Sequence, residues 1–415
     1  MTSQNTTIHT DPHGFNNVVR LGLERITALL EKLDRPDRKL RFIHVAGTNG
    51  KGSVCAFIEA ALVADGKCVG KFTSPNLVRV NERICVNKAE ISDTDLRNVL
   101  DTVGSAAEKI ASETGESPTQ FEIWCAAAML HFAQKKCDIV LLEVGLGGEY
   151  DATNVIEKCE IAVICHIDID HTAYLGNTIE DIARAKCGII KENITSGKVI
   201  TCEQYPEAAK IISETTISRG HKLTVAKAPA PIAHDSIHEI VCLEGIDDIR
   251  LSLGGEYQIK NAALAAATLT ALGIGKDKIK AGLESAVHHA RFEEIADGVI
   301  FDGGHNPDGV RSLDASLVRY YPKAPMNVIY ACMKDKDIES TLSILNKSDR
   351  NFIFTTVQNN PRAMSADNLF KYAKEKCGIT GTAAQTLHDA IALARKNGHL
   401  TVICGSLYLY GDLYQ

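Results

Sequence analysis

The feature that most constrains the fold is a series of short apolar runs separated by helical stretches. Examples are Arg41–Ala46 (RFIHVA), Asp138–Val144 (DIVLLEV) and Ile161–Cys165 (IAVIC). These runs are nearly continuous in apolar residues, whereas a strand with one face in water would alternate apolar and polar residues. Continuous runs are typical of parallel strands that helices cover on both faces of a sheet. The sequence therefore predicts an α/β fold with a mostly parallel sheet.

The patterns along the chain indicate two domains after a short tail. Residues 1–12 are polar and show no periodicity, so we expect a flexible tail there. A helical pattern gives way to a new alternation of strands and helices near Glu293. We therefore expect a first domain over 13–293 and a smaller α/β domain over 294–415. The strands expected in the second domain are 299–302, 328–331, 352–356 and 401–404.

Composition and charge narrow the class of function. The chain has 45 Lys and Arg against 52 Asp and Glu, a net charge of −7, and this does not favour nucleic-acid binding, which needs phosphate-neutralising cations. The sequence shows no signal peptide, no membrane-spanning apolar run and no basic block, so we expect a cytoplasmic protein without a nucleic-acid or membrane partner. Thirteen cysteines without CxxC pairs indicate a reducing compartment, and no thiol stands out as reactive.

The strongest motif is a glycine-rich loop between the first apolar run and a helical stretch. Glycines let several backbone N–H groups point at one anion, the helix N-terminus adds partial positive charge, and Lys51 can reach the terminal phosphates. The loop is shorter than the usual G-x-x-x-x-G-K-[ST], and Gly52 stands where a hydroxyl residue is expected. A glycine-rich turn with an incidental lysine is the alternative. The residues predicted to bind nucleotide are Gly47, Thr48, Asn49, Gly50, Lys51, Gly52 and Ser53.

Two further charged residues, Glu143 and Lys186, lie near predicted strands or helices where their role depends on their surroundings. Glu143 ends an apolar run at the edge of the sheet where α/β proteins bind ligands, and Mg²⁺ beside ATP phosphates would be a suitable partner for its carboxylate. The alternative is a carboxylate that emerges into water. Lys186 lies in a helical stretch over 179–190, and periodicity alone predicts a solvated cation there.

Five motifs, in the same order, resemble the folylpolyglutamate synthase/dihydrofolate synthase family of the Mur ligase superfamily. They are TNGKGS at 48–53, FTSP and VNER at 72–75 and 80–83, LEVGLGG and DATN at 142–148 and 151–154, DHT and IARAK at 170–172 and 182–186, and DGGHNP at 302–307. The resemblance covers nearly the whole chain. It implies a P-loop-containing, Mur-ligase-like central domain with a mostly parallel sheet, followed by a smaller Rossmann-like α/β C-terminal domain.

The resemblance also implies a reaction. ATP would phosphorylate the carboxylate of a folate or dihydropteroate, and the amine of L-glutamate would displace phosphate from the acyl phosphate to form an amide. Such a ligase depends on ATP and Mg²⁺, and because the family is mostly monomeric we expect a monomer. The implied catalytic residues are Lys51, Glu143, His171 and Lys186, and the implied magnesium ligands are Ser74, Glu143 and His171. Lys186 would be carbamylated, which replaces its ammonium with an oxygen-donating anion.

The remaining implied roles concern the substrates. Further ATP contacts would come from Asn261, Arg291 and Asp302. The incoming glutamate would be held by Arg83, His305 and Ser406; a surface salt bridge is the alternative for Arg83. The residues that would line the pterin pocket are Arg25, Thr119, Phe121, Glu122, Asp151 and Ala152.

Several positions depart from the family pattern. Glu149 stands where arginine is usual, Tyr257 replaces a histidine, His289-Ala290 replaces Pro-Gly, and Arg20 lies where some dihydrofolate synthases carry an acid. These changes bear on the acceptor more than on the chemistry. The alternatives to the folate ligase are another Mur-type ligase, such as one acting on a peptidoglycan precursor, a P-loop ATPase or nucleotide-gated binding module, and a folate-binding paralogue without ligase activity.

Overall fold

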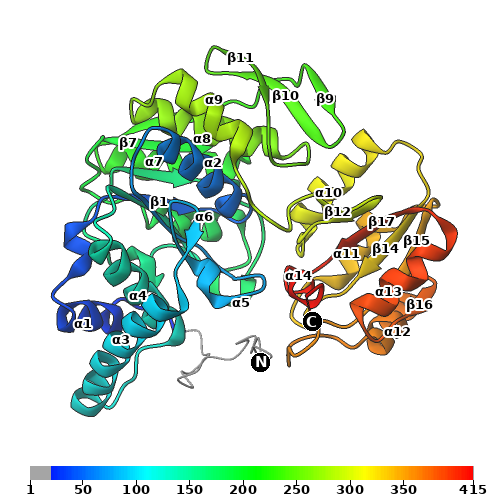
Figure 1. The fold of residues 1–415 in the computed structure, drawn as a ribbon, viewed down its shortest axis with the longest axis horizontal. Helices are drawn as coiled ribbons and strands as arrows, with labels where there is room; N and C mark the ends of the chain where they lie inside the picture. Colours follow the sequence, from blue (N-terminus) through cyan, green and yellow to red (C-terminus); the bar gives the residue numbers. More distant parts are fainter. Residues whose placement is uncertain (1–19, 415) are drawn as a thin grey trace, which may run out of the picture. The chain divides into compact units, whose positions relative to one another are not determined.

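A computed structural model describes residues 20–414 and shows an α/β protein (Figure 1). By contacts, the chain divides into two compact units. Unit 1 comprises the described residues up to 230 together with 242–249 and 260–286, and unit 2 comprises 231–241, 250–259 and the residues from 287 onward. The tail expected at 1–12 lies outside the described residues, and the domain boundary expected at 293 stays a prediction.

Unit 1 is built on an eight-stranded sheet with the order β4-β3-β2-β5-β1-β6-β7-β8. The strands from β2 to β8 in this order pair in parallel, and β3 and β4 join antiparallel at one edge. The predicted class and the mostly parallel sheet are confirmed. The strands are β1 (Phe42–Ala46), β2 (Val69–Phe72), β3 (Ile84–Val86), β4 (Ala89–Glu90), β5 (Ile139–Glu143), β6 (Ile161–Ile164), β7 (Lys198–Cys202) and β8 (Lys222–Ala226).

Helices cover this sheet because their apolar faces find a partner there. Helix α2 is apolar on almost every side and is buried accordingly, and Ala61 on α2 approaches α9 so closely that a Cβ at Gly282 would lie 2.5 Å from it. Helices α1, α3 and α4 pack together (Figure 1). The helices are α1 (Glu24–Lys32), α2 (Lys51–Ala64), α3 (Asp93–Thr114), α4 (Gln120–Gln134), α5 (Thr172–Leu175), α6 (Ile179–Cys187), α7 (Pro206–Ser218), α8 (Gln258–Ala271) and α9 (Lys276–Ser285), with short 3-10 helices at Pro36–Lys39, Val80–Arg83 and Ala152–Val155.

Unit 2 contains a six-stranded sheet with the order β12-β13-β17-β14-β15-β16, parallel except for β12. Its strands are β12 (Glu293–Ala296), β13 (Val299–Phe301), β14 (Met326–Tyr330), β15 (Arg350–Phe354), β16 (Gly381–Ala383) and β17 (Leu400–Cys404). Its helices are α10 (Pro307–Tyr320), α11 (Ile338–Leu345), α12 (Ala366–Cys377), α13 (Leu387–Ala394), a 3-10 turn at Arg395–Asn397 and α14 (Leu409–Asp412). The four strands expected here from the sequence are confirmed to within two residues.

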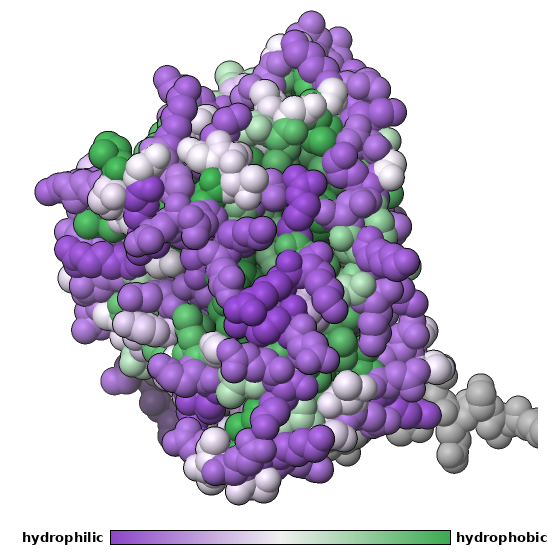
Figure 2. Space-filling model, turned by 90° about the vertical axis from the view of Figure 1, so that its left-hand side faces the viewer, coloured by the Kyte–Doolittle hydropathy of each residue, from purple (hydrophilic) through white to green (hydrophobic). Residues whose placement is uncertain are grey.

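The described residues form one further, smaller sheet. Strands β9 (Ala233–Asp235), β10 (His238–Leu243) and β11 (Ile246–Arg250) form a three-stranded sheet through which the division into units passes. Hydrophilic side chains predominate on the face drawn in Figure 2, with small apolar groups between them. None of the helices in the described part of the chain has both the length and the apolar content to cross a membrane.

Candidate active site

The predicted phosphate loop connects β1 to α2, as the sequence indicated. Gly47 and Gly50 have φ values of 151° and 89°, in the region that favours glycine. A Cβ at Gly47 would lie 2.5 Å from the Cβ of Cys165, and one at Gly50 would collide with the amide oxygen of Asn261. Side chains larger than hydrogen are therefore excluded at both positions. The first turn of α2 begins at Lys51, directly after Gly50, so the N–H groups of this turn point towards the loop.

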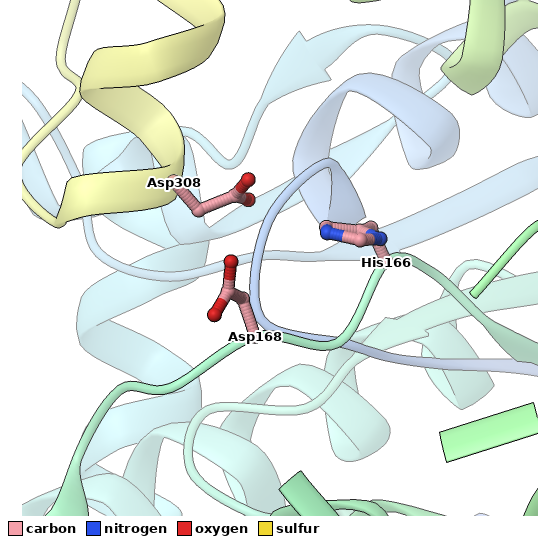
Figure 3. Close-up of side chains that lie close together, drawn as sticks. All are labelled: His166, Asp168 and Asp308. Carbon is pink, nitrogen blue, oxygen red and sulfur yellow. The ribbon is translucent and has the colours of Figure 1, made fainter. Parts of the chain in front are cut away.

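The phosphate loop is held by the segment that follows β6. The backbone N–H of Thr48 donates to the carbonyl of His166 at 2.8 Å, and its hydroxyl donates to the carbonyl of Asp168 at 2.9 Å. The backbone N–H of Asp168 lies 3.0 Å from the same hydroxyl. Figure 3 shows the loop that carries His166 and Asp168 beside the phosphate loop; the third residue drawn, Asp308, lies in the first turn of α10 in unit 2. Neither His166 nor Asp168 was predicted from the sequence, although their place at the end of an apolar run was a usable signal.

Lys186 is buried and reaches the phosphate loop. Its Nζ donates to the carbonyl oxygen of Gly47 at 3.0 Å, and only 4% of the residue is exposed. The interpretation of Lys186 as a solvated cation is therefore wrong. Helix α6 comes close because Gly148 has no side chain: a Cβ there would lie 2.7 Å from the carbonyl of Ala185. Burial, and secondly the nearby ammonium of Lys51, lower the pKa of Lys186 to about 7.

Glu143 lies at the carboxyl end of β5, next to Val45 of β1, the strand that leads into the phosphate loop. Its side chain is buried, and the backbone N–H of Ser74 donates to its Oε2 at 3.3 Å. The alternative interpretation, a Glu143 carboxylate that emerges into water, is therefore wrong. A buried carboxylate in contact with the backbone of a serine brings together two residue types that carry oxygen donors, so the residues present fit Mg²⁺.

Unlike the buried Glu143, His171 is exposed to solvent. It occupies the position before α5 with φ 54°, and its side chain makes no capping hydrogen bond. The imidazole is exposed, with its Nε2 3.9 Å from Oδ2 of Asp170. Its role as a magnesium ligand stays a prediction.

A buried chain of hydrogen bonds connects β1 to Asp151. The carboxylate of Asp151 accepts from the backbone N–H of Leu146 at 2.8 Å, from the backbone N–H of Thr153 at 3.0 Å and from the Thr153 hydroxyl at 2.5 Å. Since that hydroxyl donates to Asp151, its oxygen accepts from Nε2 of His44, 3.0 Å away. Burial lowers the pKa of His44 and raises that of Asp151. A neutral His44 therefore orients Thr153, which in turn fixes Asp151. Neither His44 nor Thr153 was predicted from the sequence as a site residue.

Three of the other residues expected in the pterin pocket, Arg25, Thr119 and Glu122, are linked to one another by hydrogen bonds. Thr119 and Glu122 form a capping box at the start of α4, and Nε of Arg25 donates to Oε2 of Glu122 at 3.2 Å. Phe121 lies over Gly145, where a Cβ would be 2.5 Å from its ring, and its centroid is 5.8 Å from that of Phe72. Ala152 is buried directly after Asp151. These contacts give Thr119, Glu122 and Arg25 a structural role, whatever they bind.

In unit 2, the carboxylate of Asp302 is buried and accepts hydrogen bonds from three donors. It accepts from the Tyr257 hydroxyl at 2.7 Å, from the backbone N–H of Phe292 at 3.0 Å and from that of Gly304 at 2.7 Å. Burial raises the pKa of Asp302. Tyr257, which departs from the family pattern, is thus the side-chain donor to this acid. The guanidinium of Arg291 lies at Gly303, where a Cβ would be 2.6 Å from its Nη1.

The three residues expected to hold glutamate lie in different elements. Arg83 ends the 3-10 helix at Val80–Arg83 in unit 1, and its Nε donates to Oδ1 of Asn76 at 2.8 Å. In unit 2, Nδ1 of His305 is 3.3 Å from the carbonyl of Gly303, and the buried hydroxyl of Ser406 accepts from the backbone N–H of Tyr408 at 3.2 Å. Their shared role stays a prediction.

Glu149 has its backbone tied down while its side chain faces outward. Its N–H donates to the carbonyl of Ala185 at 2.8 Å, and its carbonyl accepts from Nδ2 of Asn154 at 2.9 Å. A Cβ at Gly188 would collide with the backbone of Glu149. The segment after Gly148 is therefore fixed by the end of α6, and the charge reversal at 149 sits on the surface.

Known proteins resemble this chain over nearly its whole length. The family profile of the Mur ligase middle domain matches residues 45–269, and that of the dihydrofolate synthetase C-terminal domain matches 286–415. The chain is 33% identical to a dihydrofolate synthase/folylpolyglutamate synthase of Bacillus subtilis, covering 95% of this chain and 94% of the relative. It is 32% identical to a folylpolyglutamate synthase of Lacticaseibacillus casei, covering 97% and 96%.

Solved structures match the fold of this chain over a similar share of its length. Folylpolyglutamate synthase of Mycobacterium tuberculosis, complexed with ADP and AMPPCP, matches with a TM-score of 0.86 and 30% identity over 95% of each chain. The E. coli FolC in complex with DHPP and ADP matches with a TM-score of 0.83 and 28% identity, covering 97% of this chain and 94% of that one. Sequence and fold agree, and the chain belongs to the folylpolyglutamate synthase/dihydrofolate synthase family of Mur ligases.

Proposed function

We propose that this chain is an ATP- and Mg²⁺-dependent ligase that joins L-glutamate to a folate, with dihydropteroate as a second acceptor to be tested. The observation that carries the proposal is the buried Lys186 amine on the Gly47 carbonyl of the phosphate loop. A cation buried beside another cation is costly in a fold that serves structure alone. The cost is understandable if the lowered pKa that burial gives Lys186 keeps part of its amine neutral for a reaction at the phosphate loop.

The chain's own groups would act in two steps. The phosphate loop and Lys51 would bind the phosphates of ATP and orient the γ-phosphoryl group towards the folate carboxylate. The resulting acyl phosphate would then be attacked by the glutamate amine, which forms the amide and releases phosphate. Bound at Ser74, Glu143 and His171, Mg²⁺ would supply positive charge that stabilises the transferring phosphoryl group.

We further propose that Lys186 acts as a carbamate. Its neutral amine would add to CO₂ and lose one proton, leaving an anion with oxygen donors. The pKa of about 7 supports this, because it leaves a large share of the amine neutral at physiological pH. The modification predicts about 44 Da of added mass on the Lys186 peptide when CO₂ is retained during preparation.

The remaining assignments concern substrate recognition. Asn261 is proposed to contact ATP, which its approach to Gly50 in the phosphate loop supports. Arg291 and Asp302 are proposed as ATP contacts from unit 2. Arg83, His305 and Ser406 are proposed to hold L-glutamate, because a guanidinium pairs well with a carboxylate. Asp151, with Phe121 nearby, is proposed to bind the pterin.

The test is a product analysis by mass spectrometry. The protein is incubated with ATP, Mg²⁺ and L-glutamate, and with either tetrahydrofolate or dihydropteroate, while phosphate release is followed in parallel. We expect addition of one glutamyl residue and phosphate release that requires both the pterin substrate and glutamate. Lys51→Met should abolish both signals, whereas the matched control Lys67→Met, in the loop that follows α2, should not. Phosphate release indifferent to both substrates would instead identify an ATPase.

A further inference from the structure

Two cysteines that are far apart in the sequence lie side by side at the amino ends of two neighbouring strands of the unit 1 sheet. The phosphate loop follows the carboxyl end of β1, at the other end of these parallel strands. Cys68 directly precedes β2, and Cys137 precedes β5, its parallel neighbour. Their Sγ atoms are 3.9 Å apart. The backbones are fastened together here, because the N–H of Asp138 donates to the carbonyl of Cys68 at 2.8 Å and the N–H of Cys68 donates to Oδ2 of Asp138 at 2.7 Å.

This separation is short enough for a covalent bond. A disulfide is about 2.05 Å long, so the two sulfurs need to approach by less than about 2 Å. The hydrogen bonds between Cys68 and Asp138 hold the two backbones together, so the approach of the sulfurs would have to come from rotation of the cysteine side chains.

One of the two thiols is accessible to reagents. Cys68 is half-buried, as are Cys242 and Cys377, whereas the other cysteines, Cys137 included, are buried. The chain neighbours of the pair, Lys67 and Asp138, line a cavity of about 440 Å³. Arg41 and Asp65 also line it, so the cavity presents both signs of charge. Nζ of Lys67 pairs with Oδ2 of Asp65 at 3.0 Å, and a partly exposed pair of this kind can exchange partners with the carboxylate and the ammonium of a small zwitterionic molecule.

We propose that Cys68 and Cys137 form a thiol modification site, which a small zwitterionic peptide disulfide converts into an intramolecular disulfide. The Cys68 thiolate attacks one sulfur of the external disulfide, which gives a mixed disulfide and releases one thiol. The Cys137 thiol then loses its proton to solvent, and its sulfur attacks Sγ of Cys68 and expels the second thiol. Two protein thiols and one external disulfide thus become one protein disulfide and two thiols.

The order of attack follows from the surroundings of the two sulfurs. Burial, and secondly the adjacent Cys68 sulfur, raise the pKa of Cys137 to about 12. Cys68 is the more exposed of the pair, so it is the thiol that meets the external disulfide first. The product would tie together the starts of β2 and β5, whose other ends lead to Ser74 and Glu143. Because the bond closes a long loop, it should raise the thermal unfolding midpoint by several degrees.

The experiment uses the full chain and glutathione disulfide as the probe. Reduced protein is incubated with excess probe, the remaining thiols are blocked with N-ethylmaleimide, and peptides are analysed without reduction. We expect a cross-linked pair of peptides containing Cys68 and Cys137, which dithiothreitol separates. Cys242 and Cys377 are internal controls, because they are half-buried in β10 and at the end of α12 and should yield mixed disulfides only.

Two variants separate the steps. Cys137→Ser should stop the reaction at a mixed disulfide on Cys68, and Cys68→Ser should leave Cys137 reduced. If either variant fails to fold, as judged by circular dichroism, the wild-type result still decides. Cys68 and Cys137 that remain separately alkylated after prolonged exposure to the probe would overturn the proposal. No readout here uses ligase activity, so this outcome is distinct from a failure of the proposed function.

Discussion

Replacing Lys186 with methionine should stabilise the fold near neutral pH even though it removes a group proposed for catalysis. The fold lowers the pKa of Lys186 from 10.5 to about 7. This difference of about 3.5 pKa units, at about 1.4 kcal/mol each, amounts to at most about 5 kcal/mol of destabilisation. The hydrogen bond from Nζ to Gly47, which the variant loses, offsets about 1 kcal/mol of that. Methionine is similar in length, so it fills the same space.

The pH dependence identifies the cause. Between the folded and the unfolded pKa of Lys186, the unfolded chain binds more protons, so the stability of the wild type rises with pH. The penalty is fully present below about pH 7 and is relieved as the pH rises towards 10.5. The variant carries no such group. Its advantage over the wild type should therefore be largest below pH 7 and shrink above it by about 1.4 kcal/mol per pH unit.

The assay is urea unfolding of both proteins at several pH values from 6 to 9. Buffers are freed of CO₂, because a carbamate on the wild type would change the charge at Lys186. Lys210→Met serves as the control, since Lys210 is exposed on α7 and should show no comparable trend. A stability difference between Lys186→Met and wild type that does not change with pH would refute the reasoning.

Three further outcomes are expected. Glu143→Gln should lower the rate of phosphate release at least about 100-fold, because a neutral amide is a weaker ligand for the proposed Mg²⁺ than a carboxylate, with unchanged circular dichroism; a fully active variant would contradict its proposed role. Thr153→Val should raise the KM for the pterin substrate more than it lowers kcat, because Asp151 loses a donor, while Thr153→Ser should behave as wild type in steady-state kinetics. Equal effects of both substitutions would argue against the hydroxyl. Tyr257→Phe should destabilise unit 2 by about 1–3 kcal/mol in urea unfolding, because the buried Asp302 loses its side-chain donor, and an unchanged midpoint would show that water replaces it.

Local patterns carried most of the fold. The run RFIHVA and the following glycines predicted a strand, a phosphate loop and a helix, and β1 and α2 flank that loop as expected. Runs such as DIVLLEV became parallel strands because a segment without a polar face must be covered on both sides. The order of strands in the sheet was beyond local patterns, since it depends on which distant segments pair.

The same distinction holds for the residues of the candidate active site. Some were predictable from the sequence around them, and others depend on distant segments. Lys51 and the loop glycines were identified from their own neighbourhood. Lys186 was misjudged from periodicity, because its burial depends on Gly148, nearly forty positions earlier, letting α6 approach the loop. The partners His44 and Thr153 were missed, since nothing close in sequence relates them to one another.

The amino-acid order alone therefore determined the elements, the phosphate loop and the resemblance to a family of ligases. These depend on spacing along the chain, which sequence records directly. Tertiary structure decided which charges became buried, namely Lys186 on the Gly47 carbonyl, Glu143 beside Ser74, and Asp302 under Tyr257. Desolvation and hydrogen bonding shift a group's chemistry only once distant segments have come together, and that is a property of the packed chain.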